Sequence, residues 1–408
     1  MSFVEEAIKF HAEKTGMLET AAKVPLETRE DLSLAYTPGV AEPCKAIKEN
    51  KELSFEYTCR GNTIAIVSDG TRVLGLGDIG PEAAMPVMEG KAVLFKTFGG
   101  VDAIPICIDT KDPEEIIKMV RLLQPSFAGI NLEDFSSPKC YDIEDRLKEI
   151  CDIPVFHDDQ HGTAIACLSG VIGGLRYVKK DIKDVKVVVN GCGAAGSAIG
   201  RLLVSMGAKN VIMVERVGAL YKGIDAKLDK MQTHLSEITN PNMEKGTLVD
   251  VAKGADVLIG VSGPNLFTKE IIASMADKAI VFGLANPVPE TSYAAAIEAG
   301  AAVAGTGRSD SPNQVNNVTV FPGVFRGALD VRATTINEEM KVAAVYAIAN
   351  LIDEKDLRAD YVVPDVFDRR VAPAVAAAVA KAAIESGVAR IKVDPETVRA
   401  NALKRIGR

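Results

Sequence analysis

Several features that mark other classes of protein are missing from this 408-residue sequence. No apolar run approaches the roughly 18 residues that a membrane-spanning helix needs. The first residues carry acids where a secretory signal requires basic side chains. The seven cysteines include no Cys-x-x-Cys pair, which argues against a zinc site or a disulfide framework. These absences predict a cytoplasmic protein with reduced thiols and no membrane partner.

Concentrated positive charge is missing as well. The formal net charge is -8, the sequence pI is about 5.3, and the lysines and arginines are spread along the chain. A nucleic-acid partner would need a dense basic surface to neutralise phosphates, so we expect none. Because the overall charge repels anions, any anionic substrate must meet positive charge supplied locally at its site.

The first half of the chain contains short apolar segments that alternate with helical ones. The expected strands are 63–68, 103–108, 127–132 and 153–156, and the expected helices between them include 113–123 and 141–150. Strand–helix–strand connections of this length give parallel neighbours with right-handed crossovers. We therefore expect the carboxyl ends of these strands at one edge of a sheet.

A second alternating block follows a helical segment over residues 162–179. Its expected strands are 185–190, 211–215, 257–261, 279–284 and 301–304, with a helix over 194–206, and the chain from Glu338 onward is expected to be mostly helical. The predicted fold class is α/β, with an N-terminal α/β domain over 1–162. A Rossmann-type doubly wound domain with C-terminal helices is expected over 163–408. No linker marks the boundary.

A glycine-rich turn in the second block carries the pattern of a dinucleotide site. The turn consists of Gly191, Cys192, Gly193, Ala194, Ala195 and Gly196. It follows a strand and opens a helix, so its glycines allow a tight turn and close approach of the backbone to a pyrophosphate. Glu215 ends the next strand, where a carboxylate can bind the ribose hydroxyls of NAD. An ordinary glycine turn with a solvated glutamate is the alternative.

Two acidic pairs end successive strands of the first block. They are Glu133 with Asp134, and Asp158 with Asp159. One helix separates the two strands, so both pairs are expected at the same edge of the sheet. Clustered carboxylates repel one another unless a cation neutralises them, and oxygen ligands favour Mg²⁺ or Mn²⁺. Alternatively, these acids only end strands or cap a helix. The flanking His157 and His161 are expected to support the site rather than bind the cation.

Six segments, in order along the chain, resemble the motifs of malic enzymes. They are YTPGV at 36–40, LGLGDIGPEAAMPVMEGKAVLFKTF at 74–98, NLEDF at 131–135, VFHDDQHGT at 155–163, LANPVP at 284–289 and VNNVTVFPG at 315–323. The resemblance is greatest to short prokaryotic members. It implies an NAD(P)-dependent enzyme that oxidises malate and decarboxylates it to pyruvate, with the first domain binding substrate and metal. It also implies a homodimer or larger homo-oligomer.

The resemblance assigns roles to individual residues. Glu133, Asp134 and Asp159 would bind Mn²⁺ or Mg²⁺, with Asp158 beside them. Lys91 would accept the proton of the malate hydroxyl, which at neutral pH requires burial or a nearby cation to depress its pKa. Tyr36, with Lys91 nearby, would protonate C3 of the enol intermediate. Without the resemblance, the lysine is typical of a helix surface and the tyrosine of a turn.

Further polar residues are implied at the substrate and the cofactor. Asn286 and Asn317 would bind the substrate carboxylates, Asn286 would also lie at the cofactor, and Asn316 is a weaker candidate. Arg72 would clamp a carboxylate, or equally lie on the surface as a solvated arginine. Glu215 favours NAD because it would repel the 2′-phosphate of NADP, whereas Arg216 could bind that phosphate. We expect NAD to be preferred and NADP tolerated.

Three alternative functions remain open at this point. A metal-free amino-acid dehydrogenase would combine similar domains but leave the acidic pairs unexplained. A non-catalytic dinucleotide sensor would bind NAD(H) without turning over malate. A malolactic-type enzyme would retain the reduced cofactor and release lactate instead of pyruvate.

Overall fold

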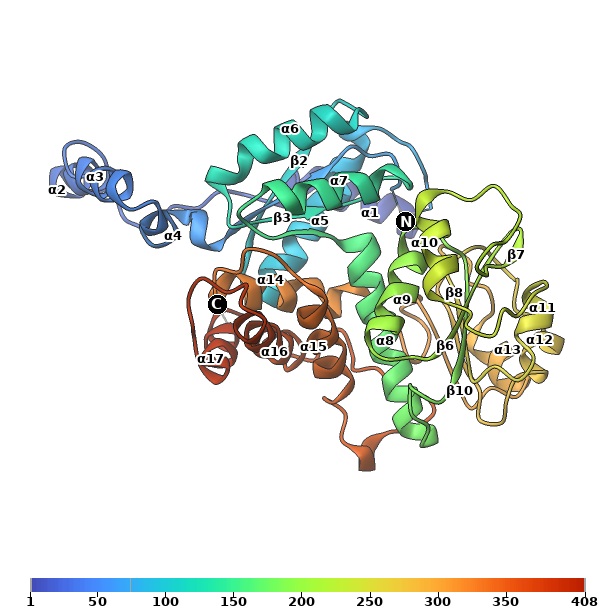
Figure 1. Cartoon of the computed structure of the whole chain (residues 1–408). Helices are drawn as coiled ribbons and strands as arrows, with labels where there is room; N and C mark the ends of the chain where they lie inside the picture. The colour runs from blue at the N-terminus through green and yellow to red at the C-terminus, as the bar shows by residue number, and fades with distance from the viewer. Residues whose placement is uncertain (1, 74, 407–408) are drawn as a thin grey trace.

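The computed structural model describes residues 2–73 and 75–406, and its two parallel sheets confirm the α/β fold (Figure 1). The first sheet has the order β2-β1-β3-β4. Its strands are β1 (Thr63–Ser68), β2 (Asp102–Cys107), β3 (Gly129–Leu132) and β4 (Val155–His157). Leu74, the first residue of the segment 74–98, lies outside the described residues.

Helices connect these strands and cover the sheet. They are α5 (Pro81–Gly99), α6 (Pro113–Leu123) and α7 (Lys139–Ile150), with the short turn η3 (Gln124–Ser126) before β3. The apolar face of α6 is buried by Ile116, Ile117 and Val120, as its helical spacing predicts. Strands β3 and β4 are direct neighbours, with Leu132 opposite His157. The residues that follow these two strands therefore emerge side by side.

The second sheet has the order β10-β9-β8-β5-β6-β7. Its strands are β5 (Lys186–Asn190), β6 (Asn210–Glu215), β7 (Gly218–Ala219), β8 (Val257–Gly260), β9 (Ile280–Gly283) and β10 (Val303–Thr306). The helices of this block are α9 (Ala194–Ser205), α10 (Lys230–Ile238), α11 (Leu248–Val251), α12 (Lys269–Ala273) and α13 (Tyr293–Glu298). Only β7 is antiparallel. Two residues are too few for a periodic pattern, so the sequence did not predict it.

One long helix joins the two blocks. Helix α8 (Asp158–Val178) begins directly after β4, four residues before the expected start at 162, and it runs between the two sheets (Figure 1). Carboxylates are favoured in the first turn of a helix, where the dipole is positive, which accounts for the early start at Asp158 and Asp159. The expected boundary at 162–163 falls inside this helix, and the division into domains stays a prediction.

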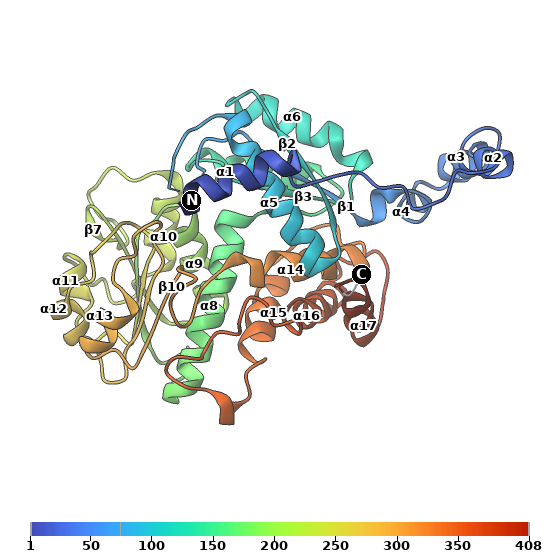
Figure 2. The ribbon, with the colours of Figure 1, turned by 180° about the vertical axis from the view of Figure 1, so that it is seen from behind.

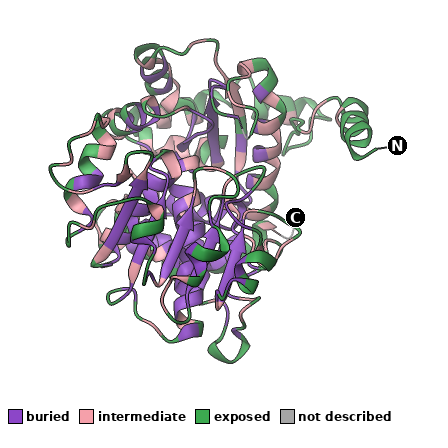
Figure 3. Ribbon diagram, turned by 90° about the vertical axis from the view of Figure 1, so that its right-hand side faces the viewer, coloured by how far each residue is buried: buried purple, intermediate pink, exposed green. Residues whose placement is uncertain are grey.

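The C-terminal helices complete the core beneath the first sheet. They are α14 (Phe321–Asp330), α15 (Glu338–Ala349), α16 (Val371–Glu385) and α17 (Pro395–Ile406), with the turns η4 (Asn317–Thr319) and η5 (Glu354–Asp356). The Phe95 ring on α5 lies 4.5 Å from that of Phe321 and 5.3 Å from that of Phe325, between ring centroids. Figure 3 shows the buried residues concentrated in the sheets and the helices between them. The last third of the chain therefore packs against both blocks.

The N-terminal segment differs from the rest. Its elements are α1 (Phe3–Lys14), α2 (Arg29–Ala35), α3 (Ala41–Glu49), η1 (Lys51–Leu53), α4 (Ser54–Tyr57) and η2 (Cys59–Asn62). None of the six carries a buried residue. Helices α2 and α3 project from the body in two opposite views (Figures 1 and 2).

The described residues contain neither a disulfide bond nor a helix suited to span a membrane. All seven cysteines are free thiols, four of them buried. Among residues 2–73 and 75–406, no helix combines the length and apolarity needed to cross a membrane.

Candidate active site

Three carboxylates gather at the carboxyl edge of the first sheet. Glu133 and Asp134 follow β3, and Asp159 lies in the first turn of α8, directly after the neighbouring strand β4. One oxygen from each side chain lies within 4.8 Å of the others. We call these three residues the carboxylate cluster. The structure thus brings together the acids that the sequence placed at one edge.

The cluster has the properties of a cation site. Burial raises the pKa of Asp134, and the carboxylates of Asp159 and Glu133 raise it further. Burial also raises the pKa of Glu133 and of Asp159. Within the described part of the chain, Oδ2 of Asp134 is buried without a hydrogen-bond partner. Charged carboxylates are costly in such a place unless a cation offsets them, so the donor set fits a hard divalent ion.

The backbone fixes the orientation of Asp134. Its φ of 58° lies in the left-handed region, which an aspartate tolerates better than most residues at a cost of about 1 kcal/mol. Its amide donates to Oδ2 of Asp159 at 2.8 Å, and its carbonyl accepts from the amide of Arg72 at 2.9 Å. The strained turn therefore ties the end of β3 to the start of α8.

Lys91 enters the site from α5 and is nearly buried. Its Nζ donates to Oε1 of Glu133 at 3.0 Å, forms an ion pair with Asp158, and lies 3.9 Å from the centroid of the Phe321 ring. Burial lowers the pKa of Lys91, but the carboxylates of Asp158 and Glu133 raise it by more. The protein's own charges therefore do not supply the depressed pKa that the sequence analysis required. A cation on the cluster would cancel part of the opposing negative charge.

Asn317, the first residue of η4, reaches the same site. Its Nδ2 donates to Oδ2 of Asp158 at 3.0 Å and to Oγ1 of Thr163 at 3.1 Å. Asn316 instead caps η4 by accepting the amide of Val318. The structure therefore supports Asn317 over Asn316 as the polar group next to Lys91, and it adds Thr163, which the sequence analysis did not single out.

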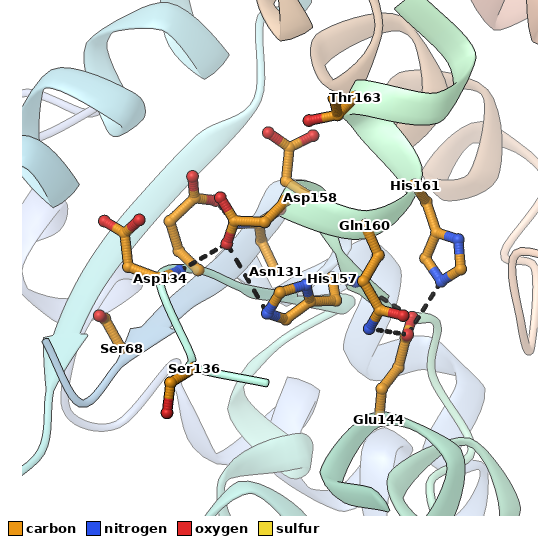
Figure 4. Close-up of polar contacts among 12 residues, drawn as sticks. Ser68, Asn131, Asp134, Ser136, Glu144, His157, Asp158, Gln160, His161 and Thr163 are labelled. Carbon is orange, nitrogen blue, oxygen red and sulfur yellow. Dashed lines mark hydrogen bonds and ion pairs between the residues drawn. The ribbon is translucent and has the colours of Figure 1, made fainter. Parts of the chain in front are cut away.

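A second layer of buried charge lies behind the carboxylate cluster. Figure 4 shows His161 and Gln160 turned toward Glu144 and away from Asp134. Nε2 of His161 lies 2.9 Å from Oε2 of Glu144, and its Nδ1 lies 3.3 Å from Nζ of Lys341. The expectation that His161 supports the site agrees with this geometry. Glu144 was missed, because nothing in the apolar pattern of α7 distinguishes it.

His157 takes a different position. It is fully buried, with Nε2 3.7 Å from Oδ2 of Asp159, and neither of its ring nitrogens has a hydrogen-bond partner among the described residues. Burial lowers the pKa of His157, so the neutral ring is favoured. The ring therefore lines the base of the cluster without adding charge to it.

The glycine-rich turn lies at the carboxyl end of β5, as predicted. We call residues 191–196 the dinucleotide loop. Gly191 has a φ of 110°, and a Cβ added at Gly196 would lie 1.8 Å from the carbonyl oxygen of Gly191. A Cβ added at Gly193 would meet no protein atom within 4 Å, which leaves its backbone open to a ligand. The loop thus has the tight turn and accessible amides that a pyrophosphate needs.

Two glutamates organise the surroundings of this loop. The carboxylate of Glu215 accepts the amides of Cys192 at 3.2 Å and Arg216 at 3.0 Å, so it lies at the loop as predicted. Glu290 was not predicted. It is fully buried and accepts the amides of Ser262 at 2.8 Å and Ala285 at 3.0 Å, which ties together the segments after β8 and β9.

Arg72 and Asn286 are both exposed. Burial and Asp158 raise the pKa of Asp159, whereas the positive charges of Lys91 and Arg72 lower it. A Cβ added at Gly75 would lie 3.1 Å from Cδ of Pro287, so the segment after β1 approaches the Asn286–Pro287 turn. Arg72 is therefore placed near the cluster, whereas the side chain of Asn286 lies beside Gly307, where an added Cβ would be 3.6 Å from its Oδ1.

Tyr36 is the one predicted catalytic residue that the structure does not bring to the site. It ends α2 and is 67% exposed. Lys91 lies on α5, and Figures 1 and 2 both show α2 far from α5. The expected proximity of the two side chains is not present within one chain.

Comparison with known families matches both halves of the chain. Residues 15–148 match the family described as "Malic enzyme, N-terminal domain", and residues 160–384 match "Malic enzyme, NAD binding domain". The short interval between the two ranges, residues 149–159, contains His157, Asp158 and Asp159. Together they cover the other predicted site residues, from Tyr36 to Asn317.

Individual relatives agree with the family match. The chain is 56% identical to the "Bifunctional malic/malolactic enzyme" of Bacillus subtilis (strain 168), over 98% of this chain and 97% of that one. It is 54% identical to the "NAD-dependent malic enzyme" of Geobacillus stearothermophilus, over 92% and 78%. The crystal structure of malic enzyme from Pyrococcus horikoshii superposes with a TM-score of 0.94 at 45% identity, over 100% and 96%.

Proposed function

The chain belongs to the malic enzyme family, which oxidises and decarboxylates malate with NAD or NADP, and we propose that Lys91, Tyr36 and the carboxylate cluster carry this reaction. The observation that supports this most is the direct contact of Lys91 with Glu133, at 3.0 Å, inside the group of three acids. Glu133 thus contacts the proposed base and also belongs to the proposed cation site. A base and a cation held this close together suit the oxidation of a substrate whose hydroxyl group lies next to a carboxylate.

The roles of the two bound groups follow from their chemistry. A divalent cation held by Glu133, Asp134 and Asp159 would supply positive charge that lowers the pKa of the substrate hydroxyl and stabilises charge left by the departing CO₂. Residues 191–196 would hold the dinucleotide, which would supply a nicotinamide as acceptor for the hydride from C2.

The chain's own residues move the protons. Lys91, as the neutral amine, takes the hydroxyl proton when the C2 hydrogen leaves as hydride. Loss of the β-carboxyl group as CO₂ then leaves an enolate, and Tyr36 donates its phenolic proton to C3 to give pyruvate. Lys91 returns the first proton to the Tyr36 phenolate, so the proton count balances. Asn317, held between Asp158 and Thr163, would bind a substrate carboxylate.

The remaining assignments concern substrate and cofactor selection. Arg72 and Asn286 would bind substrate carboxylates, with Asn286 also next to the nicotinamide. We propose NAD as the preferred cofactor, with NADP tolerated, because Glu215 already points to the loop where the adenosine ribose would bind. We also propose a homodimer or larger homo-oligomer.

A spectroscopic assay tests this function. With malate, Mn²⁺ and NAD, we expect reduced cofactor and pyruvate to form in equal amounts, and removal of the cation by EDTA to stop both. Turnover that is unchanged after complete chelation would contradict the cation site.

A second candidate function is supported by the Bacillus subtilis relative, whose name includes a malolactic activity. In that reaction the same site would keep the reduced cofactor and return its hydride to pyruvate, giving lactate and CO₂ from malate. Lactate formed without accumulation of reduced cofactor would identify this outcome in the same assay.

A further inference from the structure

Helices α8 and α9 each begin at one of the two proposed binding sites, and they pack against each other. Helix α8 carries Asp159 of the carboxylate cluster in its first turn, and α9 begins at Ala194 within the dinucleotide loop. The position of one helix relative to the other therefore sets the position of the cluster relative to the loop. Hydride transfer is sensitive to such placement, because an error of about 1 Å can cost about 100-fold in rate.

Gln160, the residue after Asp159, links these two helices. It is 1% exposed. Its Nε2 donates to Oε2 of Glu144 on α7 at 3.0 Å, and its Oε1 accepts from Nη2 of Arg201 on α9 at 3.2 Å. Figure 4 shows the amide turned toward Glu144. A single buried amide therefore connects three helices at the point where α8 starts.

The two neighbours of this amide explain why the residue is a glutamine. A carboxylate only accepts hydrogen bonds and a guanidinium only donates them, so a side chain between Glu144 and Arg201 must offer one donor and one acceptor. A glutamate at position 160 would face Glu144 with a second negative charge. The bridge thus has the composition of a specific contact rather than of general packing.

Helix α7 reaches both sites through further contacts. Oε1 of Glu144 accepts the amide of His157 at 3.1 Å, which fixes the end of β4 where α8 begins. The hydroxyl of Tyr141 donates to Oγ of Ser197 at 3.4 Å, and that Oγ donates to the carbonyl oxygen of Cys192 at 2.8 Å. One series of contacts therefore ends beside the carboxylate cluster, and the other ends in the dinucleotide loop.

Stability alone does not require a polar bridge at this junction. Replacing both partners of a buried hydrogen bond by apolar groups of the same shape can leave stability nearly unchanged. A fully satisfied buried network instead selects one arrangement of the elements that it joins.

From these observations we propose that Gln160 is a positioning residue for the reaction. Its bridge from Glu144 to Arg201 holds α9 in place against α8, and so holds the dinucleotide loop at a fixed position relative to the carboxylate cluster. Gln160 acts through these two neighbours. The proposal rests on the function proposed above.

Gln160→Met tests the bridge, because methionine has about the same volume but makes neither hydrogen bond. We expect kcat for malate oxidation to fall by about 10- to 100-fold as the two sites lose their alignment. The dissociation constants of Mn²⁺ and of NAD, each titrated without malate, should stay within about threefold of the wild-type values. Ser169→Ala is the matched control and should keep the wild-type kcat. Ser169 is equally buried on α8, but its hydroxyl donates to the carbonyl oxygen of Ala166 within the same helix.

Arg201→Met breaks the same bridge from α9, where the side chain is half-buried. It should also lower kcat, and it decides the question if Gln160→Met does not fold. Because both substitutions remove one shared contact, the double variant should have about the kcat of Gln160→Met alone. A double variant whose loss is the product of the two single losses would contradict the bridge.

Amide hydrogen exchange gives a readout that needs neither malate nor turnover. In Gln160→Met, the amides of residues 197–205 in α9 should exchange at least about tenfold faster, because the helix opens locally once its tie to α8 is lost. Ser169→Ala should leave exchange in α9 unchanged. Wild-type exchange of α9 in Gln160→Met would contradict the proposal.

The possible outcomes separate this proposal from the proposed function. A folded Gln160→Met enzyme with wild-type kcat would overturn the positioning role and leave the function intact. A loss of kcat with an equal loss of affinity for NAD or Mn²⁺ would overturn it as well, because Gln160 would then serve binding rather than alignment. A wild type that does not turn over malate would instead contradict the proposed function, and hydrogen exchange would still show whether Gln160 joins the helices.

Discussion

The carboxylate cluster and the dinucleotide loop lie at the carboxyl edges of two different sheets, but they bind their ligands with different parts of the chain. The cluster consists of side-chain charges, buried at Glu133 and Asp134 and half-buried at Asp159, that raise one another's pKa. The loop consists of backbone in which Gly191 and Gly196 allow close approach. Substitutions in the cluster should therefore act by changing its charge. Substitutions in the loop should act by filling the space beside its backbone.

The largest effect is expected at Lys91, because its replacement by alanine removes the amine that acts as the base. Lys91→Ala should lower kcat by about 10³-fold, within the range for a general base, while NAD affinity changes little. Lys96→Ala on the same helix is the matched control, because the Lys96 side chain is 64% exposed and pairs with Asp102. Steady-state kinetics and NAD titration measure both. A Lys91→Ala enzyme with near wild-type kcat would remove the lysine from the mechanism.

The layer of charge behind the cluster should affect stability. Glu144→Gln leaves Lys148 and His161 without their anionic partner, and breaking a buried pair costs about 3–5 kcal/mol. Glu149→Gln, on the exposed face of the same helix, should change the free energy of unfolding by less than about 0.5 kcal/mol. Denaturant unfolding at pH 7 compares them. Equal stability of the two variants would show that Glu144 is not a structural anchor.

The pH dependence of the same residue gives an independent check. Burial alone would raise the pKa of Glu144, but the charges of His161 and Lys148 hold it well below its ordinary value. The unfolded chain then binds the proton first on acidification. The stabilisation is thus complete above about pH 4.3 and is lost as the pH falls further, toward the folded-state pKa. Glu144→Gln should lack this acid-dependent loss.

Substitutions of two glycines in the dinucleotide loop should distinguish an effect on the stability of the fold from an effect on NAD binding. Gly196→Ala would place a methyl group 1.8 Å from a carbonyl oxygen, so it should destabilise the fold and weaken NAD binding by about 100-fold, or 2.7 kcal/mol. Gly193→Ala meets no protein atom, so it should retain stability within about 1 kcal/mol and still weaken NAD binding. Thermal unfolding and NAD titration distinguish them. Unchanged NAD affinity in Gly193→Ala would argue against a pyrophosphate at this loop.

The smallest effect concerns the choice of cofactor. Glu215→Gln removes the charge that would repel a 2′-phosphate, so the preference for NAD in kcat/KM should fall by about tenfold, or 1.4 kcal/mol. Arg216→Gln, its exposed neighbour, should reduce the use of NADP only. A wild-type advantage of tenfold or more for NADP would show that Arg216 outweighs Glu215.

Local patterns were sufficient to predict much of the fold. Strand β1 and helix α6 occupy the expected residues, because their apolar spacing is set by neighbours along the chain. The grouping of the three acids also followed, since parallel strands end at one edge. The loop at 191–196 was found because strand, glycines and helix occur in immediate succession.

What the sequence did not reveal depends on contacts between distant residues. Lys341 meets His161 across 180 positions, and Glu290 is buried under a sheet edge that local pattern does not describe. The motif containing Tyr36 suggested its chemistry but not its place on a projecting hairpin. That position depends on how the whole chain packs, which a local motif does not describe.

Calorimetric titration with Mn²⁺ tests the central claim, that the buried carboxylates form a cation site. The wild type should bind one Mn²⁺ per chain in the absence of malate. Glu133→Gln and Asp159→Asn should weaken binding by at least about 100-fold, because each removes a charged ligand. Asp142→Asn, an exposed acid on α7, serves as the control. A wild type that binds no Mn²⁺, or variants that bind it as tightly, would contradict the claim.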